Sequence, residues 1–237
     1  MGTLFPGQVF SWTTVDPENS SVRRGVMKAF EMKVEAVCRK CNSGWMSKIE
    51  EQIKPMLSGT IKDGESMYFG PKDRTKLGAF TFKNAVISNY LNPKREPFFT
   101  RAIRERFRTS REIPPGVFMW FASLKTAIPS GLYLNYVLGL QIGTNSRFWD
   151  DLEMCVYTFV VGYLALQFVA FRYEHIGHRN KPLPTSLSSS DFWNDYCVSF
   201  WPNSRDTLRW PPQRSLNEKL LHKFVHRWEG PTTVLPT

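Results

Sequence analysis

The chain has 237 residues, 42% hydrophobic and 14% aromatic, which is enough for a sizeable core in one or two domains. Lysine and arginine outnumber aspartate and glutamate by 31 to 21, and this net charge of +10 favours a polyanionic partner such as nucleic acid or an anionic membrane surface. Four irregularly spaced cysteines exclude a secreted disulfide framework. No signal peptide is recognisable, so a cytoplasmic protein is expected.

The chain before the first cysteine predicts little regular structure. Residues 1–21 are rich in turn formers, with a short strand expected over residues 8–14. Residues 27–37 alternate loosely between apolar and polar side chains, which predicts a strand that leads into the first cysteine pair.

That pair, Cys38 and Cys41, forms a C-x-x-C motif. The spacing lets two thiolates hold one zinc ion from a tight turn, although zinc needs four ligands and this stretch supplies only two. A redox-active pair is an alternative, because a helix N-terminus lowers the pKa of a thiol. Zinc is the preferred interpretation, since no βαβ pattern surrounds the motif.

The residues after the pair predict a helix. Apolar side chains recur at steps of three and four between residues 45 and 57, and polar side chains occupy the other positions. Ser47 and Glu50 have the spacing of a capping box, although Asn42 or Ser43 could equally begin the helix. Turn formers follow Pro55, so a turn region is expected there.

A second helix is predicted from Pro71, a favoured first residue, to about residue 91, where Asn92-Pro93 ends it. Its apolar face would contain Leu77, Phe80, Asn84, Ile87 and Leu91.

A basic segment follows. Between residues 94 and 111, seven positive residues stand against two glutamates, a local net charge of +5. If residues 100–108 are helical, Arg101, Arg104 and Arg108 share one face, while Ile103 and Phe107 point toward a core. Guanidinium groups bind phosphates without reading the base sequence, so this face indicates either nucleic-acid contact or an ordinary solvated surface.

The chain from residue 117 to about residue 201 is strand-like. Candidate strands are residues 117–124, 132–142, 153–162 and 163–172, and their short connections indicate an antiparallel meander. Residues 154–171 carry no charge, which is near the lower limit for a membrane span. Gln167, Gly162 and the many β-branched and aromatic residues favour two buried strands or one long bent strand instead.

The C-terminal part predicts a loop over residues 180–190, an aromatic strand or cover over residues 192–201, and a last helix. Ser215 and Glu218 form a capping-box candidate, and the helix would end at Gly230-Pro231. Its apolar side would carry Leu216, Leu220, Phe224 and Trp228. His222 and His226 lie four residues apart on it, but their basic neighbours argue against a metal site.

Residues 38–57, CRKCNSGWMSKIEEQIKPML, resemble a branch of HNH-endonuclease-like bacterial proteins, most of them uncharacterised. Members of this branch carry C-x-x-C-N-x-G-W-M-S followed by a glutamate and Lys-Pro. A weaker likeness continues in the same order over most of the chain. It includes the helix up to Leu91, Arg106-Phe107, Pro114-Pro115-Gly116-Val117, Trp120, residues 161–168, Trp201-Pro202 and Trp210-Pro211-Pro212.

The resemblance implies a β-hairpin and helix that hold a catalytic metal, with a hairpin histidine that activates water against a phosphodiester. It places Cys38 and Cys41 at the second of two cysteine knuckles that clamp a structural zinc, and Asn42 at the last motif position, as the candidate catalytic residue. A divalent metal such as magnesium is implied if the chain is catalytic, and DNA is the implied partner.

This sequence departs from that pattern, because no cysteine or histidine precedes Cys38 and the first histidine is His175. The chain is therefore either shortened at its N-terminus or diverged there, and the general base and half of the zinc site are missing. His175 and His178 could complete a Cys2His2 set, a partner could complete the knuckle, or the knuckle could be vestigial. Cys155 and Cys197 lie among apolar residues and are expected to be buried thiols.

The predicted fold class is α+β, with a zinc-knuckle and helix unit packed on a body of helices and antiparallel sheet. Residues 1–58 would form the HNH-like remnant and residues 59–237 the body. The expected function is that of an HNH-endonuclease-like protein acting on nucleic acid, incomplete or inactive as this chain. The alternative is a non-enzymatic zinc-knuckle module that binds nucleic acid or protein.

The expected nucleic-acid contacts are basic side chains of the knuckle and of the basic segment: Arg39, Lys40, Lys48, Arg101, Arg104 and Arg108. Trp45, Trp120 and Trp228 are expected in the core rather than stacked on bases. No membrane partner is expected, and a homo-oligomer is left open.

Overall fold

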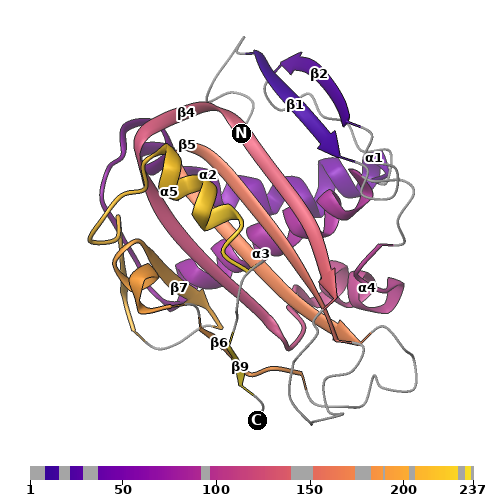
Figure 1. Cartoon of the computed structure of the whole chain (residues 1–237). Coiled ribbons are helices and arrows are strands. Elements are labelled where there is room, and N and C mark those ends of the chain that lie inside the picture. The colour runs from indigo at the N-terminus through magenta and orange to yellow at the C-terminus, as the bar shows by residue number, and fades with distance from the viewer. Residues whose placement is uncertain are drawn as a thin grey trace.

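The computed structural model describes residues 9–15, 22–28, 37–91, 97–139, 152–173, 183–188, 190–202, 206–228 and 233–235. These residues form helices and antiparallel sheets, which confirms the predicted α+β class. The longest strands, β4 (Val117–Gly139) and β5 (Leu152–Tyr173), pair antiparallel through the middle of the molecule (Figure 1). β7 (Cys197–Trp201) pairs with the other edge of β4, so the strand order is β5-β4-β7.

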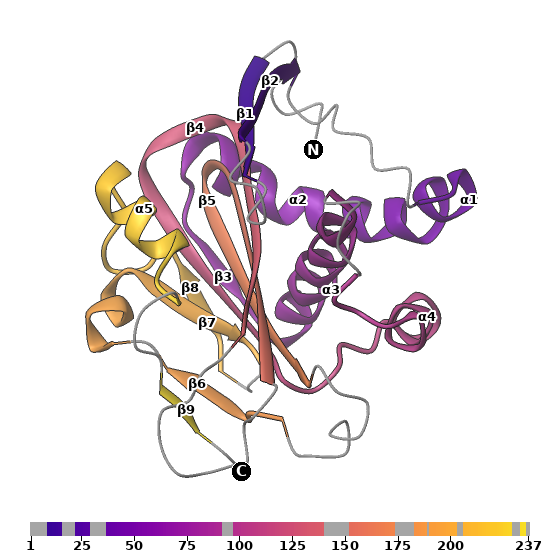
Figure 2. The same cartoon turned by 45° about the vertical axis from the view of Figure 1, so that its right-hand side comes forward.

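Helices cover both faces of this sheet. Figure 2 shows α2 (Ser47–Asp63) and α3 (Pro71–Ser88) on one side and α5 (Glu218–Val225) on the other. Two apolar clusters fill the two interfaces, one with side chains of α2 and α3 and the other with side chains of α5. Burial on both faces explains the apolar run of β5. Among the described residues, no helix has the length and apolar character needed to cross a membrane.

The four strands predicted between residues 117 and 172 are two long ones, and β5 bends at Gly162. Before the bend, odd-numbered side chains such as Phe159 and Val161 face α2 and α3, whereas after it the even-numbered Leu164 and Leu166 do. This change of parity indicates a β-bulge, and the register between β4 and β5 shifts in the same region. Gly162 has φ +56°, and a Cβ there would lie 1.8 Å from the carbonyl oxygen of Ile61 in α2. Glycine is therefore required at this position.

The knuckle helix is longer than predicted. It begins with α1 (Arg39–Cys41), continues through the π-helical turn η1 (Asn42–Met46), and joins α2 after a kink at Gly44, whose φ of −99° and ψ of −110° are not helical. The predicted turn region after Pro55 starts later than expected, since α2 runs on to Asp63 and ends at Gly64, which has φ +69°. The apolar stripe continues past Pro55 as Leu57 and Ile61, whose burial offsets the hydrogen bond that proline cannot donate. The helix thus crosses residue 58, the boundary predicted from the sequence.

Neither predicted capping box forms. Ser47 is the first residue of α2, and its hydroxyl donates to Oε1 of Glu51 at 3.2 Å instead of capping with Glu50. At α5 the cap is Asn217, whose Oδ1 accepts from the Leu220 N–H at 2.9 Å. Ser215 is engaged elsewhere, because its hydroxyl lies 2.9 Å from that of Ser123 in β4. A tertiary contact engages Ser215, whereas Ser47 forms a local contact within α2.

The second predicted helix is confirmed as α3, followed by η2 (Asn89–Leu91). It is more deeply buried than a single apolar face would allow, because residues 77–83 are all buried. Lys83 is among them, only 3% exposed, and forms an ion pair with Glu50 of α2. Burial lowers the pKa of Lys83, and the charge and hydrogen bond of Glu50 act in the opposite direction.

Glu50→Gln should lower the free energy of unfolding by about 1–3 kcal/mol at neutral pH, because it leaves a buried ammonium without its anion. The folded pKa of Lys83 lies below the unfolded one, so unfolding takes up a proton and stability rises with pH between the two values. Without the charge of Glu50, the folded pKa of Lys83 falls further, so the variant gains more stability with rising pH than wild type does. The stability loss should therefore shrink as the pH approaches the pKa of lysine in the unfolded chain. Urea titrations at pH 7 and pH 9.5 test this, with the exposed Glu51→Gln as a control expected within about 0.5 kcal/mol of wild type. A loss that is equal at both pH values would contradict the account.

The remaining strands form short two-stranded sheets. β1 (Val9–Val15) pairs with β2 (Val22–Lys28), β3 (Met67–Phe69) with β8 (Leu208–Trp210), and β6 (Ser186–Ser188) with β9 (Thr233–Leu235). The strand predicted over residues 27–37 overlaps β2 only at its first residues, and residues 29–36 lie outside the described part. The aromatic segment after residue 190 is the 3-10 helix η4 (Asp191–Asp195) followed by β7.

Candidate functional site

The cysteine pair lies at the outer end of α2, away from the β4–β5 sheet (Figure 2). The Cys41 N–H donates to Sγ of Cys38 at 3.4 Å, and the Asn42 N–H donates to the Cys38 carbonyl at 3.0 Å. These bonds close the turn that the C-x-x-C spacing predicts. The pKa of Cys38 is lowered, first by the backbone hydrogen bond from Cys41 and less strongly by Lys40. Cys38 is exposed and Cys41 is half-buried.

The donor types and the closed turn fit zinc, but the number of ligands does not. A structural zinc site has four sulfur or nitrogen ligands, and the turn offers two. Within the described ranges, no group of three or more histidine, cysteine, aspartate or glutamate side chains could hold a metal. His175 and His178 lie outside those ranges. A zinc ion held here would need two further ligands, from a part of the chain beyond the described residues or from another molecule.

Asn42, the candidate catalytic residue, is exposed at the start of η1. The histidines that the structure describes are His222 and His226, with ring centroids 4.7 Å apart, on or directly after α5. That helix lies across the sheet from α2 (Figure 2). The described residues thus bring no imidazole to Asn42 that could activate water.

The predicted basic helix is confirmed as α4 (Arg101–Ser110), capped by the Thr100 hydroxyl. Trp45 of η1 connects it to the knuckle. The Trp45 ring meets Phe107 of α4 edge to face, with centroids 5.7 Å apart, and Arg111 lies over the Trp45 ring at 4.5 Å. Phe107 is buried, as predicted, and anchors α4 to the core. These contacts hold the last turn of α4 beside η1.

Arg108 brings the charge of α4 to the knuckle. Its pKa is raised, first by the hydrogen bond and charge of Glu105, 2.7 Å away, and further by the nearby thiols of Cys41 and Cys38. Arg108 is exposed, and its pair with Glu105 through Nε offsets part of its charge. The basic side of α4 therefore adjoins the cysteine turn, although the two are far apart in the sequence.

The other predicted contact residues divide into two groups. Arg104 is partly buried, donates to the Phe99 carbonyl at 2.8 Å and lies over the Tyr90 ring at 5.5 Å, so its main contacts are with the protein. The exposed ones are Arg39, Lys40, Lys48 and Arg101. Sequence reasoning missed Arg111, which lies past the predicted helix end and whose contact with Trp45 no local pattern indicates.

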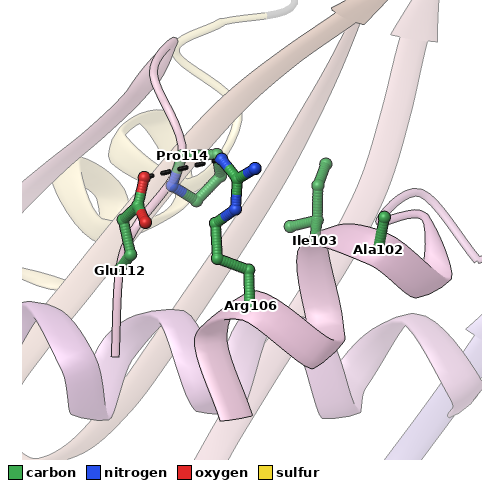
Figure 3. Close-up of a pocket in the computed structure, with 5 residues that line it drawn as sticks. All are labelled: Ala102, Ile103, Arg106, Glu112 and Pro114. Carbon is green, nitrogen blue, oxygen red and sulfur yellow. Dashed lines mark ion pairs between the residues drawn. The ribbon is translucent and has the colours of Figure 1, made fainter. Parts of the chain in front are cut away.

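A small pocket lies on the other side of α4 (Figure 3). Its lining is Ala102, Ile103, Arg106, Glu112 and Pro114. Arg106 Nη1 and Glu112 Oε1 are 3.6 Å apart, and both side chains are largely exposed. The pocket holds one cation paired with one anion, and its other lining side chains are apolar.

A polar network inside the protein surrounds Gln167, which is fully buried in β5. Its Oε1 accepts from Arg227 Nε at 2.6 Å and Trp228 Nε1 at 2.8 Å, and its Nε2 donates to Thr158 Oγ1 at 3.0 Å and the Phe224 carbonyl at 2.9 Å. Arg227 also lies over the Trp228 ring at 4.4 Å. This network fastens α5 to the sheet, which is a structural role.

Both remaining cysteines are buried, as predicted. Cys197 accepts a hydrogen bond from Arg227 Nη1 at 3.0 Å. Burial nevertheless raises the pKa of Cys197, against the effect of Arg227, so this thiol is not activated.

Comparison of the chain with models of protein families, with curated proteins and with solved structures finds no match in any of the three. The functional argument therefore rests on the residues and contacts described above.

Proposed function

We propose that this chain is a nucleic-acid-binding protein that holds DNA on the basic surface around its cysteine turn. We call this the knuckle surface and define it by the exposed basic residues of α1, α2 and α4: Arg39, Lys40, Lys48, Arg101 and Arg108. The observation that carries the proposal is the contact between η1 and α4 through Trp45, Phe107 and Arg111. It places Arg108 beside the cysteines, so that positive charge from two separate segments adds up.

The chemistry of this surface suits phosphates better than bases. Guanidinium groups and lysines bind phosphate oxygens, and the release of counterions then contributes much of the affinity. The aromatic residues nearest the surface, Trp45 and Phe107, pack against each other and are not free to stack on bases. Binding should therefore depend strongly on salt and little on base sequence.

Metal-dependent cleavage, as in HNH endonucleases, is the second candidate. The observation that favours it is the position of Asn42, directly after Cys41 and next to the basic residues. Cleavage also needs an activated water and a metal with an open position. We therefore propose the binding role for this chain and regard it as inactive in hydrolysis on its own.

A salt titration with matched charge variants tests the binding role. In the double variant Arg101→Ala/Arg108→Ala, affinity for a fluorescent duplex of about 20 base pairs should fall about tenfold at low salt. The slope of log K against log salt should become shallower by about two, since each lost phosphate contact contributes about 0.9. Fluorescence anisotropy measures both quantities.

The matched control removes two positive charges from α5, on the other side of the sheet. Lys219→Ala/Lys223→Ala should change the affinity less than twofold, because both side chains are exposed far from the knuckle surface. An equal loss in both double variants would mean that only net charge matters, and the knuckle surface would be rejected. Affinity that does not fall with salt would reject nucleic-acid binding through phosphates altogether.

A further inference from the structure

The cysteine turn offers two of the four ligands of a zinc site, and it lies on the outside of the molecule. Figure 2 shows α1 at the tip of the molecule, beyond the end of α2 and clear of the sheet. Cys38 is exposed and Cys41 is half-buried, so another molecule can approach the turn. In a site completed within one chain, the remaining ligands would instead have to fold over this tip.

Hydrogen bonds within the chain hold the shape of the turn. Besides the Cys41 N–H to Cys38 Sγ bond of 3.4 Å, the Ser43 hydroxyl donates to the Arg39 carbonyl at 2.8 Å. Little conformational entropy therefore remains to be lost when the two sulfurs bind a metal. Two thiolates would fill two of the four positions of a tetrahedral zinc, so two positions would remain for other ligands.

We propose that two copies of this chain share one zinc ion, each giving the thiolates of Cys38 and Cys41 across a two-fold axis. The inference concerns the cysteine turn that the knuckle surface surrounds, and it does not depend on DNA binding. If the two-fold axis passes through the metal, the second copy supplies the two missing ligands, because it brings its own Cys38 and Cys41. Four thiols bind one Zn²⁺ and release four protons, with no change of oxidation state.

The charges around the turn suit four thiolates. Zinc with four thiolates carries a net charge of −2, and each copy brings the exposed cations Arg39, Lys40 and Arg108 close to it. Without metal the same surfaces repel, since each chain has a formal net charge of +10. The dimer should therefore form only when the metal is bound.

Cobalt(II) titration of the reduced, metal-free chain tests the proposal, because the absorption of bound cobalt reports the number of thiolates. Uptake should saturate at about half an equivalent per chain, with the charge-transfer intensity of four thiolates. Light scattering after gel filtration should show the mass doubling from 27.5 kDa, and zinc should give the same result. Cys38→Ser and Cys41→Ser should each abolish metal uptake and doubling while keeping the wild-type circular dichroism spectrum.

The variant His175→Ala/His178→Ala distinguishes a zinc site shared by two chains from a site completed by histidines of the same chain. It should bind cobalt and dimerise like wild type. One equivalent of cobalt per monomer, lost in the histidine variant, would overturn the proposal, and so would a failure to bind either metal.

The duplex titration separates this inference from the proposed function. Half-equivalent cobalt binding without salt-dependent DNA binding would leave the dimer standing and reject the basic surface. DNA binding without metal uptake would reject the zinc-bridged dimer and support the basic surface.

Discussion

Gly162→Ala should lower the free energy of unfolding by about 3 kcal/mol. The new Cβ would lie 1.8 Å from the carbonyl oxygen of Ile61, so either α2 or β5 must move. Overpacking of this kind costs about 1–3 kcal/mol, and the positive φ of 56° adds about 1–2 kcal/mol for a residue with a side chain. A smaller entropy loss on folding returns less than about 1 kcal/mol. Urea denaturation followed by tryptophan fluorescence measures the change.

Gly70→Ala is the matched control. Gly70 caps α3 with φ −75°, and an added Cβ would meet only Asp73 Oδ2, at 3.7 Å. This substitution should therefore cost only about 0.5 kcal/mol. If Gly162→Ala were no more harmful than Gly70→Ala, the close contact between β5 and the end of α2 would be wrong.

Gln167→Leu should cost about 3–5 kcal/mol, the largest loss expected for a single side chain of β5. Leucine fills the space but offers no acceptor to Arg227 and Trp228 and no donor to the Phe224 carbonyl. Each buried polar group left without its partner costs about 1–3 kcal/mol. Because most of these partners belong to α5 and the residues after it, that end of the chain should detach first.

Two measurements distinguish this loss from a general effect of leucine. Gln52→Leu, at an exposed position of α2, should leave the free energy of unfolding within about 0.5 kcal/mol of wild type. Hydrogen exchange of α5 should rise more in Gln167→Leu than exchange of α3, which packs on the opposite face of the sheet. Equal increases in both helices would mean that the network does not hold α5 in particular.

Elements with strong local signals were predictable from the sequence. Pro71 marked the start of α3, and the helix considered for residues 100–108 forms as α4. The apolar content of residues 154–171 predicted buried strand and a bend at Gly162. What failed were the local caps at Ser47 and Ser215, because burial of the α2 stripe and the hydroxyl contact with Ser123 decided those positions.

The candidate site was predictable in its parts but not in its assembly. The C-x-x-C spacing indicated a cysteine turn, and the arginines indicated a basic helix. No periodicity reveals that Phe107 meets Trp45 or that Arg111 lies over the same ring, since these contacts join distant segments. Nor could helical spacing show that Arg104 turns toward the Phe99 carbonyl while Arg101 and Arg108 remain exposed.

The seating of α2 on Gly162 also determines where the cysteines point. At 1.5 Å per residue, the first residue of α2, Ser47, lies about 21 Å along the helix from Ile61, which contacts β5. A tilt of about ten degrees at the sheet would displace the cysteine end by about 4 Å, almost twice the length of a zinc–sulfur bond. Because residue 162 has no side chain, α2 can pack closely on β5, and this packing sets the direction in which the cysteine thiols at the other end of the helix point.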